Sequence, residues 1–173
     1  MKLDKKKILK STFEWTSTIV IAIVLALLIR MFIFEIVEVK QSSMYPTLKE
    51  NEKLLITKPN YWFAEPEYGD IVILNVEENI NYVKRVIATE GQTIEIKDSV
   101  VYIDDEPLDE PYLVDDLEYS DFEKITVEEN TSFVMGDNRP ASLDSRESTI
   151  GCVDNDDIFA KAIIRFVPFT ILK

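Results

Sequence analysis

The rest of the chain is organised around the stretch Gln41-Ser42-Ser43-Met44-Tyr45-Pro46-Thr47-Leu48. It lies just beyond the only membrane-length apolar segment of the sequence and contains a candidate nucleophile, the hydroxyl of Ser43. Pro46 fixes its own φ and biases Tyr45 toward an extended backbone. We therefore expect Ser43 and Met44 to lie at the end of a strand rather than in a helix. A serine in such a place is usually only a turn residue, so the remaining sequence has to supply the argument for chemistry.

The composition excludes most ways of activating a serine. The sequence has no histidine, which excludes Ser-His-Asp triads, Cys-His dyads and His-bearing zinc or haem sites. The base for a serine nucleophile would then be a lysine, a carboxylate or a free amine, and a desolvated lysine is the attested partner. The single Cys152 can form neither an internal disulfide nor a Cys-only metal cluster. We interpret it as a small buried apolar residue.

Carboxylates near the end of the chain resemble a calcium site only superficially. Asp154, Asp156 and Asp157 stand close together, but the glycine and the distal glutamate of an EF-hand loop are missing. The sequence therefore predicts no bound metal, and nothing in it suggests a cofactor.

Charge divides the chain into two unequal parts. Residues 1–10, the basic tail, carry five lysines against Asp4, whereas the remainder carries 14 basic and 31 acidic side chains. The soluble part, about 140 residues long, has the size of one domain. Its acidic balance argues against a nucleic-acid partner, which would require a basic surface.

An apolar run follows the basic tail. It extends over Trp15–Ile29, is interrupted by Arg30 and resumes over residues 31–34. A run of this length predicts a transmembrane helix, placed here at residues 11–31. Because basic flanks stay in the cytoplasm, residues 32–173 should lie outside the cell, behind a single-pass anchor.

A cleaved secretory signal peptide has the same charge order and is the alternative interpretation. However, the apolar run is longer than the core of such a peptide. Arg30 and the bulky Met31 and Phe32 also stand where a cleavage site would need small residues. We therefore favour an uncleaved anchor.

The part after the anchor has the pattern of a mostly β protein. It shows neither βαβ alternation nor an internal repeat. Segments rich in β-branched residues predict strands at 33–39, 54–58, 71–75, 81–88, 131–135 and 158–166, and a hairpin of 93–96 with 99–103 turned at Lys97-Asp98. Residues 104–130 are acidic and interrupted by prolines, which predicts a solvated, irregular insertion without a site. The aromatics of a loop at 59–67, Tyr61-Trp62-Phe63, either cap the core or dip into the membrane interface.

Lys84 is the second unusual feature, because it stands inside a predicted strand. By alternation, Tyr82, Lys84 and Val86 share one face, and Arg85 belongs to the other. If Lys84 points inward, burial disfavours its charge and lowers its pKa, so that it could act as a general base. If Arg85 is instead the buried and paired residue, Lys84 points into solvent. The pattern alone does not decide between these two arrangements.

The third feature is the segment 136–146, Gly-Asp-Asn-Arg-Pro-Ala-Ser-Leu-Asp-Ser-Arg. Turn-forming residues and opposite charges make a salt-bridged loop one plausible interpretation. The same residues could instead scaffold a site, in which Ser142 holds an amine in place. The charged members of such a scaffold would be Asp137, Arg139, Asp144 and Arg146.

Taken together, these motifs resemble the bacterial type I signal peptidases of the Gram-positive, single-anchor kind, peptidase family S26. Four motifs carry the resemblance, in the family's order and behind its anchor: Ser43-Met44-Tyr45-Pro46-Thr47, Gly69-Asp70-Ile71-Val72, Tyr82–Val86 and Gly136–Arg146. The resemblance implies the mostly β fold that signal peptidases share with SOS-repressor peptidases. It further implies a serine endopeptidase that removes signal peptides from exported preproteins at the outer membrane face.

The resemblance also assigns roles to residues. It implies Ser43 as nucleophile and neutral Lys84 as general base in an acyl-enzyme mechanism. The implied supporting and oxyanion residues are Gln41, Ser42, Asp137, Ser142, Asp144 and Arg146, and the implied substrate contacts are Met44, Tyr82 and Val83. The backbone N–H of Ser43 would be one oxyanion donor. Gln41 stands where the family usually has glycine or a hydroxyl residue, so the second donor stays open.

Two other classes of protein share parts of this pattern. A non-cleaving homologue could assist the assembly of exported surface subunits, but the presence of both Ser43 and Lys84 counts against it. A self-cleaving Ser-Lys peptidase fused to a DNA-binding domain would need a basic recognition domain in place of the anchor. The acidic balance of the chain disfavours that reading.

Overall fold

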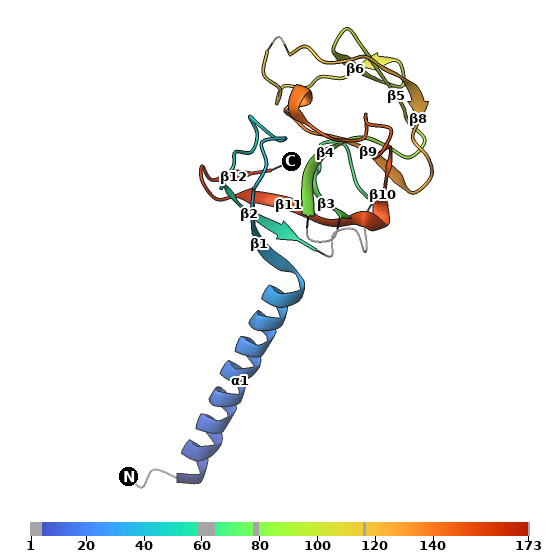
Figure 1. Ribbon diagram of the computed structural model, residues 1–173. Helices are drawn as coiled ribbons and strands as arrows, with labels where there is room; N and C mark the ends of the chain where they lie inside the picture. The colour runs from blue at the N-terminus through green and yellow to red at the C-terminus, as the bar shows by residue number, and fades with distance from the viewer. Residues whose placement is uncertain (1–4, 59–64, 78–79, 116, 173) are drawn as a thin grey trace.

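The computed structural model describes residues 5–58, 65–77, 80–115 and 117–172. A long helix, α1 (Lys5–Phe32), leads into a β-rich body and stands out from it (Figure 1). The helix contains neither glycine nor proline, which are the two residues least compatible with a helix interior. Within the described part of the chain, no helix combines the length and the apolar character that crossing a membrane requires. The aromatic loop Tyr61-Trp62-Phe63 lies outside the described residues.

The larger sheet forms the centre of the body. Its order is β1-β2-β11-β3-β4-β9-β10, with β12 paired to β11 and every pair antiparallel. The bounds of its members are β1 (Phe34–Glu38), β2 (Lys53–Thr57), β3 (Ile71–Glu77), β4 (Ile80–Thr89), β9 (Thr131–Met135), β10 (Val153–Asp154), β11 (Ile158–Arg165) and β12 (Thr170–Ile171). The strands predicted from alternation therefore lie where the sequence placed them, within a few residues at their ends.

A smaller sheet lies on the side of the body away from α1 (Figure 1). Its order is β7-β6-β5-β8, from β5 (Thr93–Lys97), β6 (Val100–Ile103), β7 (Glu106–Pro107) and β8 (Phe122–Thr126). The predicted hairpin is present, but its turn lies at Asp98-Ser99, one residue later than expected. Both turn residues have positive φ, 49° and 62°, which is the backbone that a two-residue hairpin turn requires.

The predicted description of residues 104–130 as irregular and solvated is wrong in part. The segment contains β7 and β8, and β8 pairs with β5 through contacts such as Ile94 with Ile125. Leu108, Tyr119 and Phe122 pack against the buried cluster around Phe133. The acidic residues therefore alternate with side chains that belong to the core.

Strand β4 connects the fold to the candidate site. It is hydrogen-bonded to β3 along one edge and to β9 along the other, and the five consecutive residues 84–88 are all buried, so both of its faces are covered. As a result Lys84 and Arg85, which point to opposite faces, are both buried, with 2% and 3% of their surface exposed. The two arrangements that the sequence left open are therefore not exclusive: Lys84 is buried, and so is Arg85.

Candidate active site

Ser43 lies in a turn that follows β1. The prediction of a strand end was wrong, because β1 ends at Glu38 and the backbone N–H of Tyr45 donates to the carbonyl of Ser42 at 3.0 Å. The buried side chains of Met44 and Leu48 fasten this turn to the hydrophobic core. Ser43 itself is 7% exposed. The turn thus places a nearly buried hydroxyl on a well-anchored backbone.

The segment 136–146 holds the same turn from the other side. The backbone N–H of Asn138 donates to the carbonyl of Ser43 at 2.9 Å, and its side-chain amide donates to the carbonyl of Ser42 at 3.1 Å. Gly136 allows this close approach. A Cβ atom at position 136 would lie 2.2 Å from the Ser142 Oγ and 2.5 Å from the Ser43 carbonyl oxygen.

Lys84 is fixed by a hydrogen bond from its Nζ to the Oγ of Ser142, at 3.0 Å. Burial lowers the pKa of Lys84 to about 8, although the carboxylates of Asp144 and Asp137 act in the opposite direction. Lys84 lines a cavity of about 360 Å³ together with Ser43. An amine that is partly neutral near pH 8 therefore faces the same space as the serine hydroxyl.

Asp144 is the centre of a charged support around Ser142. Its carboxylate accepts from Arg146 Nε at 2.8 Å, from Arg146 Nη2 at 2.9 Å and from the backbone N–H of Gly136 at 2.9 Å. Ser142 contributes a further hydrogen bond. Burial alone would raise the pKa of Asp144, but the bonds from Arg146 outweigh it and hold the pKa below its usual range. Asp144 therefore stays ionised beside Ser142.

Arg85 and Asp137 form a second, deeply buried ion pair. Arg85 Nε and Nη2 donate to the two oxygens of Asp137 at 2.9 and 2.7 Å, and both side chains are almost inaccessible. Thr47 Oγ1 also donates to Asp137. This pair ties the turn around Ser43, the strand with Lys84 and the 136–146 segment to one another.

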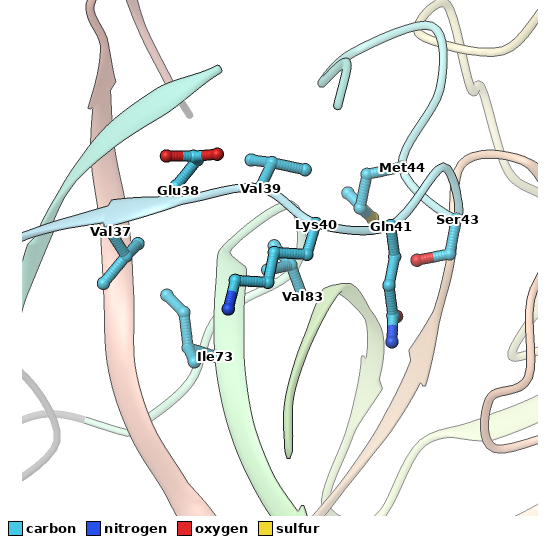
Figure 2. A pocket seen from close by; sticks show the side chains of 9 residues that line it. All are labelled: Val37, Glu38, Val39, Lys40, Gln41, Ser43, Met44, Ile73 and Val83. Carbon is cyan, nitrogen blue, oxygen red and sulfur yellow. The ribbon is translucent and has the colours of Figure 1, made fainter. Parts of the chain in front are cut away.

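A narrow groove leads away from Ser43 (Figure 2). Figure 2 shows Ser43 and Gln41 at one end of the groove and Val37 and Ile73 toward the other. The groove has a volume of about 120 Å³ and is lined by Val37, Glu38, Val39, Lys40, Gln41, Ser43, Met44, Ile73 and Val83. Its walls are apolar at Val37, Ile73 and Val83, and polar at the side chains of Glu38, Lys40 and Gln41.

The structure brings the predicted site residues together. Ser43, Lys84, Gln41 and Ser42 line one cavity, and the support of Ser142, Asp137, Asp144 and Arg146 adjoins it. Of the predicted substrate contacts, Met44 and Val83 line the groove, whereas Tyr82 lines the cavity around Lys84 instead.

Sequence reasoning missed several members of the support. The sequence pattern presents Arg85 as an alternative to Lys84 rather than as the partner of Asp137, and it gives Thr47 a place in a motif but no role. Glu110, Tyr112 and Tyr119 were overlooked, because they are embedded in the acidic 104–130 segment. For Gly136, its place within a dense polar motif was a usable signal of close backbone approach.

A substitution at Gly136 tests the close packing of this site. Gly136→Ala should lower the free energy of unfolding by about 3 kcal/mol, because the new methyl group overlaps Ser142 and a backbone oxygen. Gly91→Ala is the matched control: it has an empty surrounding and a φ of +80°, so it should cost only about 1 kcal/mol of backbone strain. Urea unfolding measures both. Equal costs for the two variants would show that Gly136 is not closely packed.

Known proteins match this chain over most of its length. Residues 12–167 match the family described as signal peptidase, peptidase S26. The chain is 40% identical to the signal peptidase I of Bacillus licheniformis, with 94% of this chain and 92% of the relative covered. It is also 40% identical to signal peptidase I T of Bacillus subtilis strain 168, with 97% and 92% covered. A crystal structure of a signal peptidase I from Enterococcus faecalis V583 aligns at 31% identity and a TM-score of 0.47, covering 55% of this chain and 94% of that one. The chain belongs to the signal peptidase family of serine peptidases, peptidase S26.

Proposed function

We propose that the chain is a membrane-anchored endopeptidase that removes signal peptides from exported preproteins, with Ser43 as nucleophile and neutral Lys84 as general base. The observation that carries this proposal is the buried Lys84 amine. It is held by Ser142 at 3.0 Å and shares a cavity with Ser43. The names of the relatives supply the substrate class, because both Bacillus proteins are called signal peptidase I.

The hydrogen bond to Ser142 orients the Lys84 amine for catalysis. A neutral amine has two hydrogens and one lone pair, and the Oγ of Ser142 accepts one of the hydrogens. The lone pair is then free to accept the proton of Ser43 while its Oγ attacks the scissile carbonyl. Lys84 passes this proton to the leaving amine, and an acyl-enzyme ester forms on Ser43. Water, deprotonated by Lys84, hydrolyses the ester and restores the free serine.

The tetrahedral intermediates need donors for their oxyanion. The backbone N–H of Ser43 is one donor in this mechanism. Gln41 lines both the cavity and the groove beside Ser43, so its side-chain amide is the candidate for the second. Loss of one such donor typically costs about 2.7–4 kcal/mol of the activation barrier.

The groove suits an extended peptide with small side chains. In an extended chain every second side chain points to the same side, so the residues one and three positions before the cut face one surface together. Main-chain hydrogen bonds supply affinity in this mode of binding, and pockets select the side chains. A groove of about 120 Å³ has room for two short side chains of this kind. This is the basis on which we assign the groove to the end of the signal peptide.

The proposed anchor is α1 with its basic tail. Apolar side chains are exposed on all sides of the helix from Phe13 to Leu28, which in water would be unfavourable. The sequence continues this run past Arg30 as far as Phe34, beyond the described side chains of α1. A bilayer would cover this surface and hold the β-rich body at the outer face of the membrane.

Membrane anchoring can be tested by alkaline carbonate extraction. The full chain should stay in the membrane pellet. The double variant Ile23→Asp, Leu27→Asp should be released, because each aspartate near the helix centre opposes insertion by about 3 kcal/mol. A control with the same charge change at exposed positions of the body, Ser120→Asp and Ser148→Asp, should remain in the pellet. Recovery of the unmodified chain in the soluble fraction would rule out the anchor.

Cleavage of a model preprotein in detergent micelles tests the assigned pair. The unmodified chain should cut after a small-x-small sequence, and N-terminal sequencing of the product locates the cut. Ser43→Ala and Lys84→Ala should both reduce turnover to background while leaving the fold intact. Lys124→Ala, which removes an exposed lysine, should cut normally. Undiminished cleavage by either active-site variant would refute its role.

The pH dependence of cleavage tests the protonation state of Lys84. Because the base must be neutral, kcat/KM should be low below the pKa, rise through about pH 8 and level off above it. Lys84→Arg should be inactive at every pH, since a guanidinium does not lose its proton. A rate that is flat from pH 6 to 10 would contradict a lysine base.

A further inference from the structure

We propose that Glu110 is a positioning residue for the catalytic lysine, acting through the arginines that hold Ser142 and Asp144 in place. The inference rests on the function proposed above. It concerns a residue in the 104–130 segment, which sequence reasoning had set aside as solvated. Three sets of contacts carry it.

The first is the pairing of Glu110 with Arg139. The Arg139 side chain is fully buried, and that of Glu110 is 8% exposed. The two groups form a bidentate pair, with Arg139 Nη1 donating to Glu110 Oε2 at 3.2 Å and Nη2 donating to Oε1. Tyr119 OH accepts a further bond from Arg139 Nη1 at 2.9 Å. A buried guanidinium without its carboxylate is strongly unfavourable, so Arg139 keeps this position only with the Glu110 side chain beside it.

The second set leads from Arg139 to the lysine. Arg139 Nε donates to the carbonyl of Gly136 at 3.2 Å, and the carbonyl of Arg139 accepts from Arg146 Nη2 at 2.7 Å. Arg146 in turn binds Asp144, which also accepts from the N–H of Gly136. Both chains of contacts thus converge on the loop that carries Ser142, the acceptor for Lys84. A shift of Arg139 would therefore move Ser142 and change the position of the Lys84 amine.

The third set reaches the other side of β4. Tyr112 OH donates to Glu110 Oε1 at 2.7 Å, and its ring lies 3.8 Å from the guanidinium carbon of Arg85. Burial, followed by the nearby Glu110 carboxylate, raises the pKa of Tyr112, so the phenol stays a neutral donor. Arg85 holds Asp137. One carboxylate therefore steadies both ion pairs of the active-site support.

The charges around Lys84 give this role a measurable signature. The charged groups that act on Lys84 are Asp144, Asp137 and Arg146, and the ring of Tyr82 lies 5.6 Å from its Nζ. Neutralising Glu110 leaves the positive charges of Arg139 and Arg146 less compensated. Protonated Lys84 then becomes less favourable, so its titration should move to lower pH. A loss of rigidity alone would not move it in this direction.

The test compares Glu110→Gln with Asp109→Asn, which removes the same charge from the exposed neighbouring residue. In cleavage assays, Glu110→Gln should lower kcat about tenfold with little change in KM, because loss of orientation affects the reaction rather than binding. The pH midpoint of the rate should fall by about half a unit. Glu110→Asp, which keeps the carboxylate, should recover part of kcat, and Asp109→Asn should behave like the unmodified chain.

A second readout separates this inference from the proposed function. The titration of Lys84, followed by NMR with labelled lysine, needs no substrate, so it reports on positioning even if the chain cleaves nothing. Should Glu110→Gln fail to fold, Tyr119→Phe removes one Arg139 contact while keeping the ring and all charges, so a smaller loss of kcat with an unchanged Lys84 midpoint is expected. The inference is overturned if folded Glu110→Gln keeps the unmodified kcat and Lys84 midpoint or, where only Tyr119→Phe folds, if that variant keeps the unmodified kcat.

Discussion

The whole site depends on one interaction, the burial of the Lys84 amine against the hydroxyl of Ser142. Burial lowers the pKa of Lys84 to about 8, whereas the amine of an unfolded chain titrates near 10.5. Below pH 8 both states are protonated and folding must bury a charge, so Lys84 lowers the stability of the native state there. As pH rises from 8 to 10.5, only the unfolded chain still binds the proton, and this cost disappears. The burial that lowers the pKa of Lys84, and so makes it useful as a base, therefore destabilises the folded state at neutral pH.

Strand pairing and buried ion pairs around Lys84 offset this destabilisation. Strand β4 is paired with β3 and β9 along its two edges, and Lys84 on it is only 2% exposed. On the opposite face, the bidentate Arg85–Asp137 pair joins the strand to the segment that carries Ser142. Gly136 lets that segment approach Ser43 more closely than any side chain would permit. The catalytic geometry proposed here is thus a consequence of backbone placement, held by buried charge pairs.

Much of this arrangement could be predicted from the sequence, and what could not has physical reasons. Segments rich in β-branched residues located the strands, because such residues suit a pleated and mostly half-buried surface. Alternation could not decide between Lys84 and Arg85, since a strand with two covered faces buries both. The sequence predicts a strand end at Ser43 instead of a turn, because the turn is held by the packing of Met44 and Leu48 in the core, which is a tertiary contact. The contribution of residues 104–130 was hidden for a similar reason: Glu110 is indistinguishable from its exposed acidic neighbours until Arg139 is folded against it.

The central claim is that Lys84 loses its proton near pH 8 rather than near the ordinary value of a lysine, and its own titration tests this most directly. Lysine labelled with ¹³C at Cε can be followed by NMR from pH 6 to 11, with Lys84→Arg identifying the resonance. The account predicts a midpoint near pH 8 for Lys84, well below the ordinary value of a lysine side chain. A midpoint near 10.5, shared with the other lysines, would mean that the amine is protonated at working pH, and the proposed Ser43–Lys84 chemistry would have to be abandoned.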